Sequence, residues 1–260
     1  MRGADAIIID LEDSTQPEAK AAARMLASDA VRTLHANGAT VTVRVNNDQQ
    51  YLAHDLEAVV MPGLRAIVLP KVEETGELES LSAMLDALEY EHELDRGTIG
   101  VVAVIESPRA LERLSAIADG PRLIGISLGS EDFALSLGRQ PSPQSLGLAA
   151  QAIAYTASAR RLMGIGMATG IANYTDLDAF GDEARRAHAA GLTGAMCIHP
   201  NQVPVLNTCF GHSENEIAEA QAILAAWEQR ADGVVSHNGK MIDQPVVERA
   251  RRLLKSAGLA

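Results

Sequence analysis

Two acidic residues, Glu106 and Asp132, lie at or just after the ends of long apolar runs. If these runs are strands, the carboxylates lie where they can bind a metal or a substrate. Glu106 comes near the end of the run Ile99–Ser107, and Asp132 follows the run Leu123–Gly129. A buried carboxylate without a partner costs free energy, so each acid needs a cation or a donor. Proteins commonly hold Mg²⁺ with one or two carboxylates, water and substrate oxygens. We therefore interpret Glu106 and Asp132 as candidate Mg²⁺ ligands, although a helix cap or a basic partner would also satisfy each of them.

Two basic residues near the ends of other apolar runs could bind an anionic substrate. Arg44 lies in the run Thr40–Asn46, and its planar guanidinium can bind a carboxylate or an enolate oxygen through two parallel hydrogen bonds. An ion pair between Arg44 and Asp10 or Glu12 is the alternative, and the two roles are compatible. Lys71 ends another run, and it could contact an anionic carrier or lie at the surface in water.

The elements that must position these residues are strands that alternate with helices. Seven short apolar runs, nearly continuous in apolar residues, read as parallel strands buried on both faces. They are Ala6–Asp10, Thr40–Asn46, Ala66–Lys71, Ile99–Ser107, Leu123–Gly129, Gly164–Thr169 and Gly194–Pro200. Alanine-rich segments of helical period lie between them, for example Pro17–His35. A capping box at Ser213–Glu216 opens a helix that we expect to continue to about Arg230. Strands that alternate with helices predict βαβ units and a parallel sheet.

Nearly every run delivers a polar or charged residue at its carboxyl end, which favours a (β/α)₈ barrel. In a doubly wound sheet the functional groups gather at one switch point, whereas in a barrel all strand ends converge on one mouth. Only seven runs are found where a closed barrel needs eight strands. The segment Met1–Asp5 reads like the end of a connection from a helix to a strand. We therefore predict an α/β fold of the TIM-barrel type that lacks its first β/α unit, with a gap beside Ala6–Asp10 or with that gap filled by another segment. The predicted domains are a catalytic barrel over 1–232 and a C-terminal lid or helical segment over 233–260.

Composition excludes several classes of protein. The chain has 260 residues and a formal charge of −12, which disfavours a general nucleic-acid binder. No apolar run has the length of a membrane helix, and Asp5 lies where a secretory signal would be apolar. The two cysteines have no metal-binding spacing. We expect a cytoplasmic protein with no membrane or nucleic-acid partner.

One competing motif is disfavoured by its context. Gly125–Gly129 matches the G-x-S-x-G pattern of serine hydrolases, but Ser127 lies inside an apolar run rather than on a sharp turn. His199 follows a run alone, which is more typical of a hydrogen-bonded structural histidine than of a metal ligand.

An ordered series of motifs resembles the citrate lyase β-subunit-like branch of the HpcH/HpaI aldolase/citrate lyase superfamily. The series is Asp10–Asp13, Val43–Asn46, Leu69–Lys71, Ile105–Ser107, Gly129–Asp132, Cys197–Pro200 and Gly239–Asp243. The resemblance covers essentially the whole chain. It implies a (β/α)₈ barrel and a Mg²⁺-dependent lyase that cleaves or forms carbon–carbon bonds in 3-hydroxyacyl thioesters such as citryl-, malyl- or citramalyl-CoA.

The resemblance also implies roles for individual residues. Glu106 and Asp132 fall on the Mg²⁺ ligands, Arg44 on the substrate-binding arginine, and Asp243 on an acid that a neighbouring subunit supplies for proton transfer. The predicted substrate-binding residues are Arg44, Glu106, Lys71, Asp10 and Glu12, and the predicted catalytic residues are Arg44 and Asp243. The implied partners are a small-molecule thioester or 2-oxo acid and further copies of the chain in a homotrimer or homohexamer.

Several positions depart from the family pattern. Ala195 and Thr169 stand where the family usually has Lys and Asp, and Asp13 stands where the pyruvate-aldolase branch has a catalytic His. A metal-dependent 2-oxo-acid aldolase without a thioester and a non-catalytic subunit are the alternatives. For Asp243 the alternative role is the N-cap of a helix through Leu254.

Overall fold

The computed structural model describes residues 3–172, 174–228 and 235–259, with the backbone alone for 235–237. The chain folds into two compact units, Met1–Asn207 and Thr208–Ala260. The sequence predicted the division between residues 232 and 233. The two divisions differ because helix α10 (Glu214–Glu228) packs against helix α11 (Gln244–Ser256) and so belongs to the second unit.

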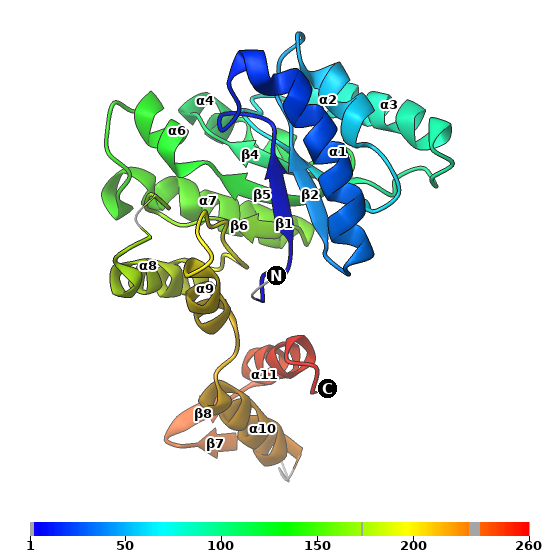
Figure 1. Cartoon of the computed structure of the whole chain (residues 1–260). Helices are drawn as coiled ribbons and strands as arrows, with labels where there is room; N and C mark the ends of the chain where they lie inside the picture. Colours follow the sequence, from blue (N-terminus) through cyan, green and yellow to red (C-terminus); the bar gives the residue numbers. More distant parts are fainter. Residues whose placement is uncertain (1–2, 173, 229–234, 260) are drawn as a thin grey trace. The chain divides into compact units, whose positions relative to one another are not determined.

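The first unit is built on a six-stranded parallel sheet whose strands follow one another in chain order (Figure 1). The strands are β1 (Ile7–Asp10), β2 (Val41–Arg44), β3 (Leu64–Leu69), β4 (Gly100–Ile105), β5 (Leu123–Leu128) and β6 (Met163–Ile165). Ile165 of β6 forms a further parallel bridge with Gly194. Sequential parallel strands are the order of a (β/α)₈ barrel, so the predicted α/β fold class is confirmed.

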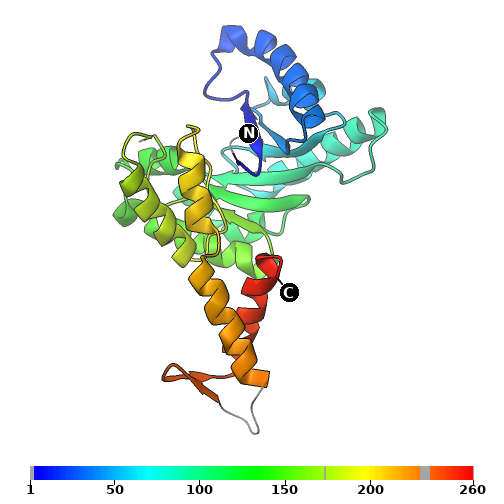
Figure 2. The ribbon, with the colours of Figure 1, turned by 60° about the horizontal axis from the view of Figure 1, so that its bottom comes forward.

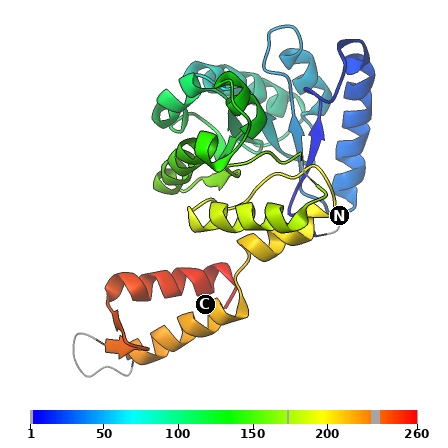
Figure 3. The same cartoon turned by 90° about the vertical axis from the view of Figure 1, so that its left-hand side faces the viewer.

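Helices connect the strands and pack against the sheet (Figure 3). They are η1 (Pro17–Ala19), α1 (Lys20–Ala36), α2 (Leu52–Val59), α3 (Thr75–Glu91), α4 (Pro108–Glu112), α5 (Leu114–Ile117), α6 (Ser130–Ser136), α7 (Pro143–Arg160), α8 (Leu177–Ala189) and α9 (Gln202–Phe210). Helix α1 packs on β1 and β2, and α7 packs on β5 and β6. Within the described ranges, no helix is long and apolar enough to cross a membrane.

Burial follows the sequence prediction in the inner strand β4 but not in β1. Every residue of β4 is buried, as expected for a parallel strand that is covered on both faces. Strand β1 is less buried, and Ile8 is 38% exposed. Among the described residues β1 pairs with β2 alone, so the sheet has an edge where the sequence predicted a gap.

The seventh apolar run differs from its prediction. Gly194–Pro200 was expected to form a strand, but only Gly194 pairs with the sheet. The Gln202 side chain accepts hydrogen bonds from the backbone N–H groups of Ile198 and His199. These contacts turn the segment toward α9, so its backbone is not available for a longer ladder.

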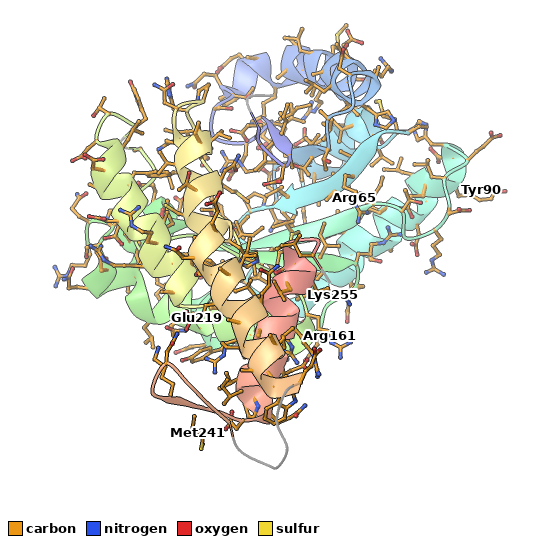
Figure 4. The ribbon with its side chains drawn as sticks, turned by 90° about the horizontal axis from the view of Figure 1, so that it is seen from below. Arg65, Tyr90, Arg161, Glu219, Met241 and Lys255 are labelled. Atoms are coloured by element: carbon orange, nitrogen blue, oxygen red, sulfur yellow. The ribbon has the colours of Figure 1, made fainter. Side chains whose placement is uncertain are left out.

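The second unit is a helical pair with a small hairpin (Figure 2). Helices α10 and α11 pack through Ala220, Ala250 and Leu254, and β7 (Val235–His237) pairs with β8 (Lys240–Ile242). The predicted capping box is confirmed, because the Glu216 backbone N–H donates to Ser213 Oγ and the Ser213 N–H to Glu216 Oε2. The predicted helix end at Arg230 lies outside the described residues. A cavity of about 340 Å³ is lined by residues of α10, β8 and α11, among them Glu219 and Met241, which Figure 4 labels.

Candidate functional site

The parallel strands of the sheet end on the same side (Figure 1), and most of the predicted site residues lie at or just after these carboxyl ends. Asp10 and Arg44 end β1 and β2 and lie opposite each other in the strand register. Lys71 follows β3, Glu106 follows β4, and Asp132 lies in the first turn of α6 after β5. Parallel strands end on the same side of a sheet, so residues distant in the sequence become neighbours here.

Arg44 is held by acidic side chains. Its Nε and Nη2 atoms donate to the two carboxylate oxygens of Asp10, each at 2.7 Å. Burial opposes the charge of Asp10, yet hydrogen bonds from Arg44 and Ser14 lower the pKa of Asp10 to about 2. The ion pair that the sequence allowed as the alternative role of Arg44 is therefore present.

Glu12 is a buried carboxylate with one unsatisfied oxygen. Its Oε1 atom accepts a hydrogen bond from Lys71 Nζ at 2.6 Å. Its Oε2 atom lies 2.9 Å from Arg44 Nη1, but outside hydrogen-bonding geometry, and has no hydrogen-bond partner among the described residues. Burial raises the pKa of Glu12 despite these two cations. A buried oxygen of this kind is suited to a further positive group.

Lys71 connects three acidic residues. Its Nζ atom lies 2.6 Å from Glu12 Oε1 and 3.5 Å from Asp13 Oδ1. Its backbone N–H donates to Glu106 Oε2 at 2.6 Å. Burial disfavours the charge of Lys71, but the hydrogen bond to Glu12 raises the pKa of the ammonium group above its ordinary value. Half of the side chain is exposed, so its charge also faces solvent.

Glu106 is a buried acid of the site, at the end of β4. The residue is 7% exposed, and burial raises its pKa to about 7 against the effect of the Lys71 N–H. The nearby charges of Asp132 and Glu12 act in the same direction as burial. A Cβ atom at position 129 would lie 2.4 Å from Glu106 Oε1, so the side chain occupies space that only a glycine leaves open. The fold therefore holds a carboxylate where its charge is costly.

This set of donors fits a hard divalent cation such as Mg²⁺. Buried carboxylates with raised pKa values and the unsatisfied oxygen of Glu12 both favour added positive charge. In the part of the chain that the structure describes, no three His, Cys, Asp or Glu side chains converge to enclose a metal ion by themselves. Mg²⁺ usually keeps several waters and takes substrate oxygens, so two protein carboxylates are compatible with it.

A second network, which sequence reasoning missed, fixes the backbone that carries Glu12. The buried Lys20 donates to the carbonyl oxygens of Leu11 and Glu12, at 2.8 and 3.1 Å, and to Asn46 Oδ1 at 2.8 Å. Asn46 in turn donates to the buried Asp55 at 2.6 Å. The only sequence signal for Lys20 was a charged residue on an otherwise alanine-rich helix face, because its partners are mostly backbone atoms.

The remaining predicted residues lie elsewhere. Asp243 is in the second unit, where its Oδ1 atom accepts a hydrogen bond from the Val246 N–H and caps α11. Its role across a subunit interface stays a prediction. Ser127 lies inside β5, as expected for a strand residue and not for a nucleophile elbow. His199 accepts a hydrogen bond from the Asn201 N–H and stacks on Tyr174, which is a structural role.

Several known proteins are similar to this chain over nearly its whole length. The β subunit of citrate lyase from Leuconostoc mesenteroides subsp. cremoris is 34% identical over 98% of this chain and 86% of its own length. L-malyl-CoA/β-methylmalyl-CoA lyase from Cereibacter sphaeroides is 29% identical over 98% of the chain and 87% of its own. A crystal structure of CitE from Mycobacterium tuberculosis, in complex with magnesium, acetoacetate and coenzyme A, matches with a TM-score of 0.79 and 27% identity over 98% of this chain and 91% of that one.

Family membership follows from the extent of these matches. The model of the HpcH/HpaI aldolase/citrate lyase family matches residues 1–200, which span the sheet and the carboxyl strand ends described above. The 34% identity to a relative continues through the second unit. The chain therefore belongs to the HpcH/HpaI aldolase/citrate lyase family.

Proposed function

We propose that this protein is a Mg²⁺-dependent carbon–carbon lyase of the retro-Claisen or retro-aldol type. Its substrate is a 3-hydroxyacyl thioester such as citryl-, malyl- or citramalyl-CoA. The observation that carries the proposal is the buried carboxyl of Glu106, whose charge is disfavoured by burial and by two neighbouring acids. A relative and a solved structure of similar fold support the substrate class, since they are named for malyl-CoA and for a complex with magnesium and coenzyme A.

Glu106 and Asp132 are the residues that would hold the metal. When bound, Mg²⁺ supplies a Lewis acid that polarises the oxygens of the 2-oxo acid fragment. Because Glu106 Oε2 accepts the Lys71 N–H, the Oε1 atom is the one left for a further contact. Asp132 begins a helix, where its charge also interacts favourably with the helix dipole.

Arg44 and Lys71 supply the positive charge that the reaction needs. Cleavage of the bond between C2 and C3 of the thioester leaves an enolate, whose charge must be stabilised where it develops. Arg44 orients the substrate, since its side chain is 27% exposed and two hydrogen bonds to Asp10 fix the plane of its guanidinium group. The half-exposed Lys71 ammonium binds an anionic part of the substrate or its carrier.

Proton transfer is assigned to Asp243. The 3-hydroxyl proton must leave as the C–C bond breaks, and a proton must return to the enolate carbon. A carboxylate can accept the first and deliver the second, directly or through water. In this proposal the segment 233–260 acts as a lid and Asp243 comes from a neighbouring copy in a cytoplasmic homotrimer or homohexamer.

The test is a substrate panel with Mg²⁺. Purified protein is incubated with citryl-, malyl- and citramalyl-CoA and with the matching free acids, and the released 2-oxo acid is measured with and without EDTA. We expect Mg²⁺-dependent release from at least one thioester, lost in Glu106→Gln and kept in Glu57→Gln, which alters an exposed acid on α2. Release from free hydroxy acids alone would instead establish an aldolase, and Mg²⁺ binding without any release would indicate a non-catalytic subunit.

A further inference from the structure

Lys71 has a backbone conformation that is uncommon for its residue type. Its φ angle is 53°, in the left-handed region that glycine and asparagine favour. A residue with a Cβ atom is sterically disfavoured in this region, because the Cβ atom comes too close to the following carbonyl oxygen. The residue directly follows Pro70 at the end of β3, so the conformation arises where the strand reaches the site. Uncommon backbone conformations that persist at such positions often have a functional consequence.

The left-handed turn lets one residue contact two carboxylates from different strands. The backbone N–H of Lys71 points at Glu106 Oε2, at 2.6 Å, while the side chain extends to Glu12 Oε1, also at 2.6 Å. Among the described residues, the Lys71 N–H is the hydrogen-bond donor to the Glu106 carboxylate. Leu69 is paired in β3, and the Val72 N–H donates to the Val104 carbonyl at 3.2 Å, so the chain is held on both sides of Lys71. A change of the Lys71 φ angle would therefore have to be taken up by the peptide group that carries the Lys71 N–H, which would move that donor away from Glu106.

Glu106 is confined from its other side by Gly129. A Cβ atom there would lie 2.3 Å from Glu106 Cγ and 2.4 Å from Oε1. The carboxylate therefore lies in a slot between a backbone donor and a glycine, and the donor selects which oxygen is engaged. Neither constraint involves a side-chain charge.

We propose that Lys71 is a positioning residue for the metal site, and that its left-handed backbone, not its ammonium group, orients Glu106. The inference rests on the proposed function, in which Glu106 is a Mg²⁺ ligand. Lys71 then makes two separate contributions to the site, one through its side chain and one through its backbone. The ammonium group acts on Glu12 and on substrate, and the peptide N–H acts on Glu106.

The test compares substitutions that remove the same charge but differ in backbone preference. Lys71→Gly keeps the left-handed conformation accessible, whereas Lys71→Val disfavours it strongly because valine is β-branched. Mg²⁺ affinity is measured by calorimetry on the folded proteins without substrate. We expect Lys71→Val to bind Mg²⁺ about tenfold more weakly than Lys71→Gly, which corresponds to about 1.4 kcal/mol. Alanine also disfavours a positive φ angle but has a smaller side chain than valine. Lys71→Ala therefore replaces Lys71→Val if the valine variant does not fold.

A matched control uses Glu93, an exposed residue after α3 with a φ angle of 56°. Glu93→Gly and Glu93→Val impose the same backbone contrast away from the site, and they should bind Mg²⁺ equally. Equal Mg²⁺ affinity in Lys71→Gly and in the β-carbon variants would overturn the inference, provided that Glu106→Gln weakens binding. If Glu106→Gln leaves the affinity unchanged, the proposed function of Glu106 fails instead, so the two failures are distinguishable.

Discussion

Arg44 is engaged by protein carboxylates and is also the residue proposed to meet the substrate. Its two bonds to Asp10 need the planar fork of a guanidinium, which lysine does not have. We expect Arg44→Lys to lower kcat/KM on the thioester substrate by about 10- to 100-fold, because a charge-assisted hydrogen bond contributes roughly 1.5–3 kcal/mol. Steady-state kinetics check this, with Arg32→Lys on the exposed face of α1 as the control. An unchanged kcat/KM in Arg44→Lys would assign Arg44 a structural role alone.

Asp10 gives the ion pair a defined pH dependence. Its pKa is lowered to about 2 in the folded chain from an ordinary 3.8, so ionised Asp10 stabilises the fold above pH 3.8. That contribution is lost as the pH falls through about 2. With the shift discounted for partial exposure, Asp10→Asn should reduce the free energy of unfolding at pH 7 by about 1–2 kcal/mol.

Urea unfolding at pH 7 and pH 3 tests this expectation. The difference between the parent and Asp10→Asn should shrink to about half at pH 3, since the unfolded chain then binds the proton more readily. Asp29→Asn, which alters an exposed acid paired with Arg32, serves as the control and should show no such change. A difference that stays constant between the two pH values would contradict the ion-pair account.

At the scale of elements, the start of α1 is tied to the ends of β1 and β2 by a single side chain. Lys20 Nζ donates hydrogen bonds to the backbone carbonyl oxygens of Leu11 and Glu12 and to the side-chain oxygen Oδ1 of Asn46, and all three residues are buried. Lys20→Met keeps the length but leaves buried acceptors without a donor, so we expect a loss of at least about 1–3 kcal/mol of unfolding free energy. Lys255→Met on α11, which is exposed (Figure 4), should stay within about 0.5 kcal/mol of the parent. A Lys20→Met protein as stable as the parent would show that water or a rearranged Asn46 replaces the ammonium group.

The elements that sequence patterns predicted best are those buried on both faces. The runs around Glu106 and before Asp132 became β4 and β5 because a parallel strand under helices must be continuously apolar. The run Gly194–Pro200 has a similar composition, yet it forms one bridge, because Gln202 engages its backbone N–H groups. Hydrogen bonds between a side chain and backbone N–H groups, such as those of Gln202, leave no trace in the hydrophobic pattern of the sequence, so they could not be predicted from it.

The same distinction holds within the site. Glu106 and Arg44 were predictable, since a charged residue at the end of an apolar run has few other places to lie. The role of the Lys71 N–H was not predictable, because it depends on one backbone angle. The contacts of Lys20 were equally hidden, since they join positions far apart in the sequence through backbone oxygens.

At the scale of the whole molecule, Asp243 of the second unit has two predicted roles, the N-cap of α11 and a proton carrier for the active site of a neighbouring copy. It caps α11 through Oδ1, and a cap alone contributes about 0.5–2 kcal/mol of stability. Loss of a proton-transfer group instead lowers the rate by roughly 100- to 10,000-fold with little change in stability. Asp243→Asn therefore separates the two roles when the unfolding free energy and kcat are measured on the same preparation.

Subunit mixing tests whether Asp243 acts across an interface. Asp243→Asn and Glu106→Gln are each expected to be inactive, because each site then lacks either its proton carrier or a metal ligand. If Asp243 is supplied by a neighbouring copy, random mixing at equal amounts gives about one quarter of sites an intact Glu106 from one chain and an intact Asp243 from another. Activity should then reappear on subunit exchange, and it should be absent when two preparations of the same variant are mixed. If verified mixed oligomers show no activity, Asp243 acts in its own barrel or takes no part in the chemistry. In either case the second unit of a neighbouring copy contributes no residue to the active site.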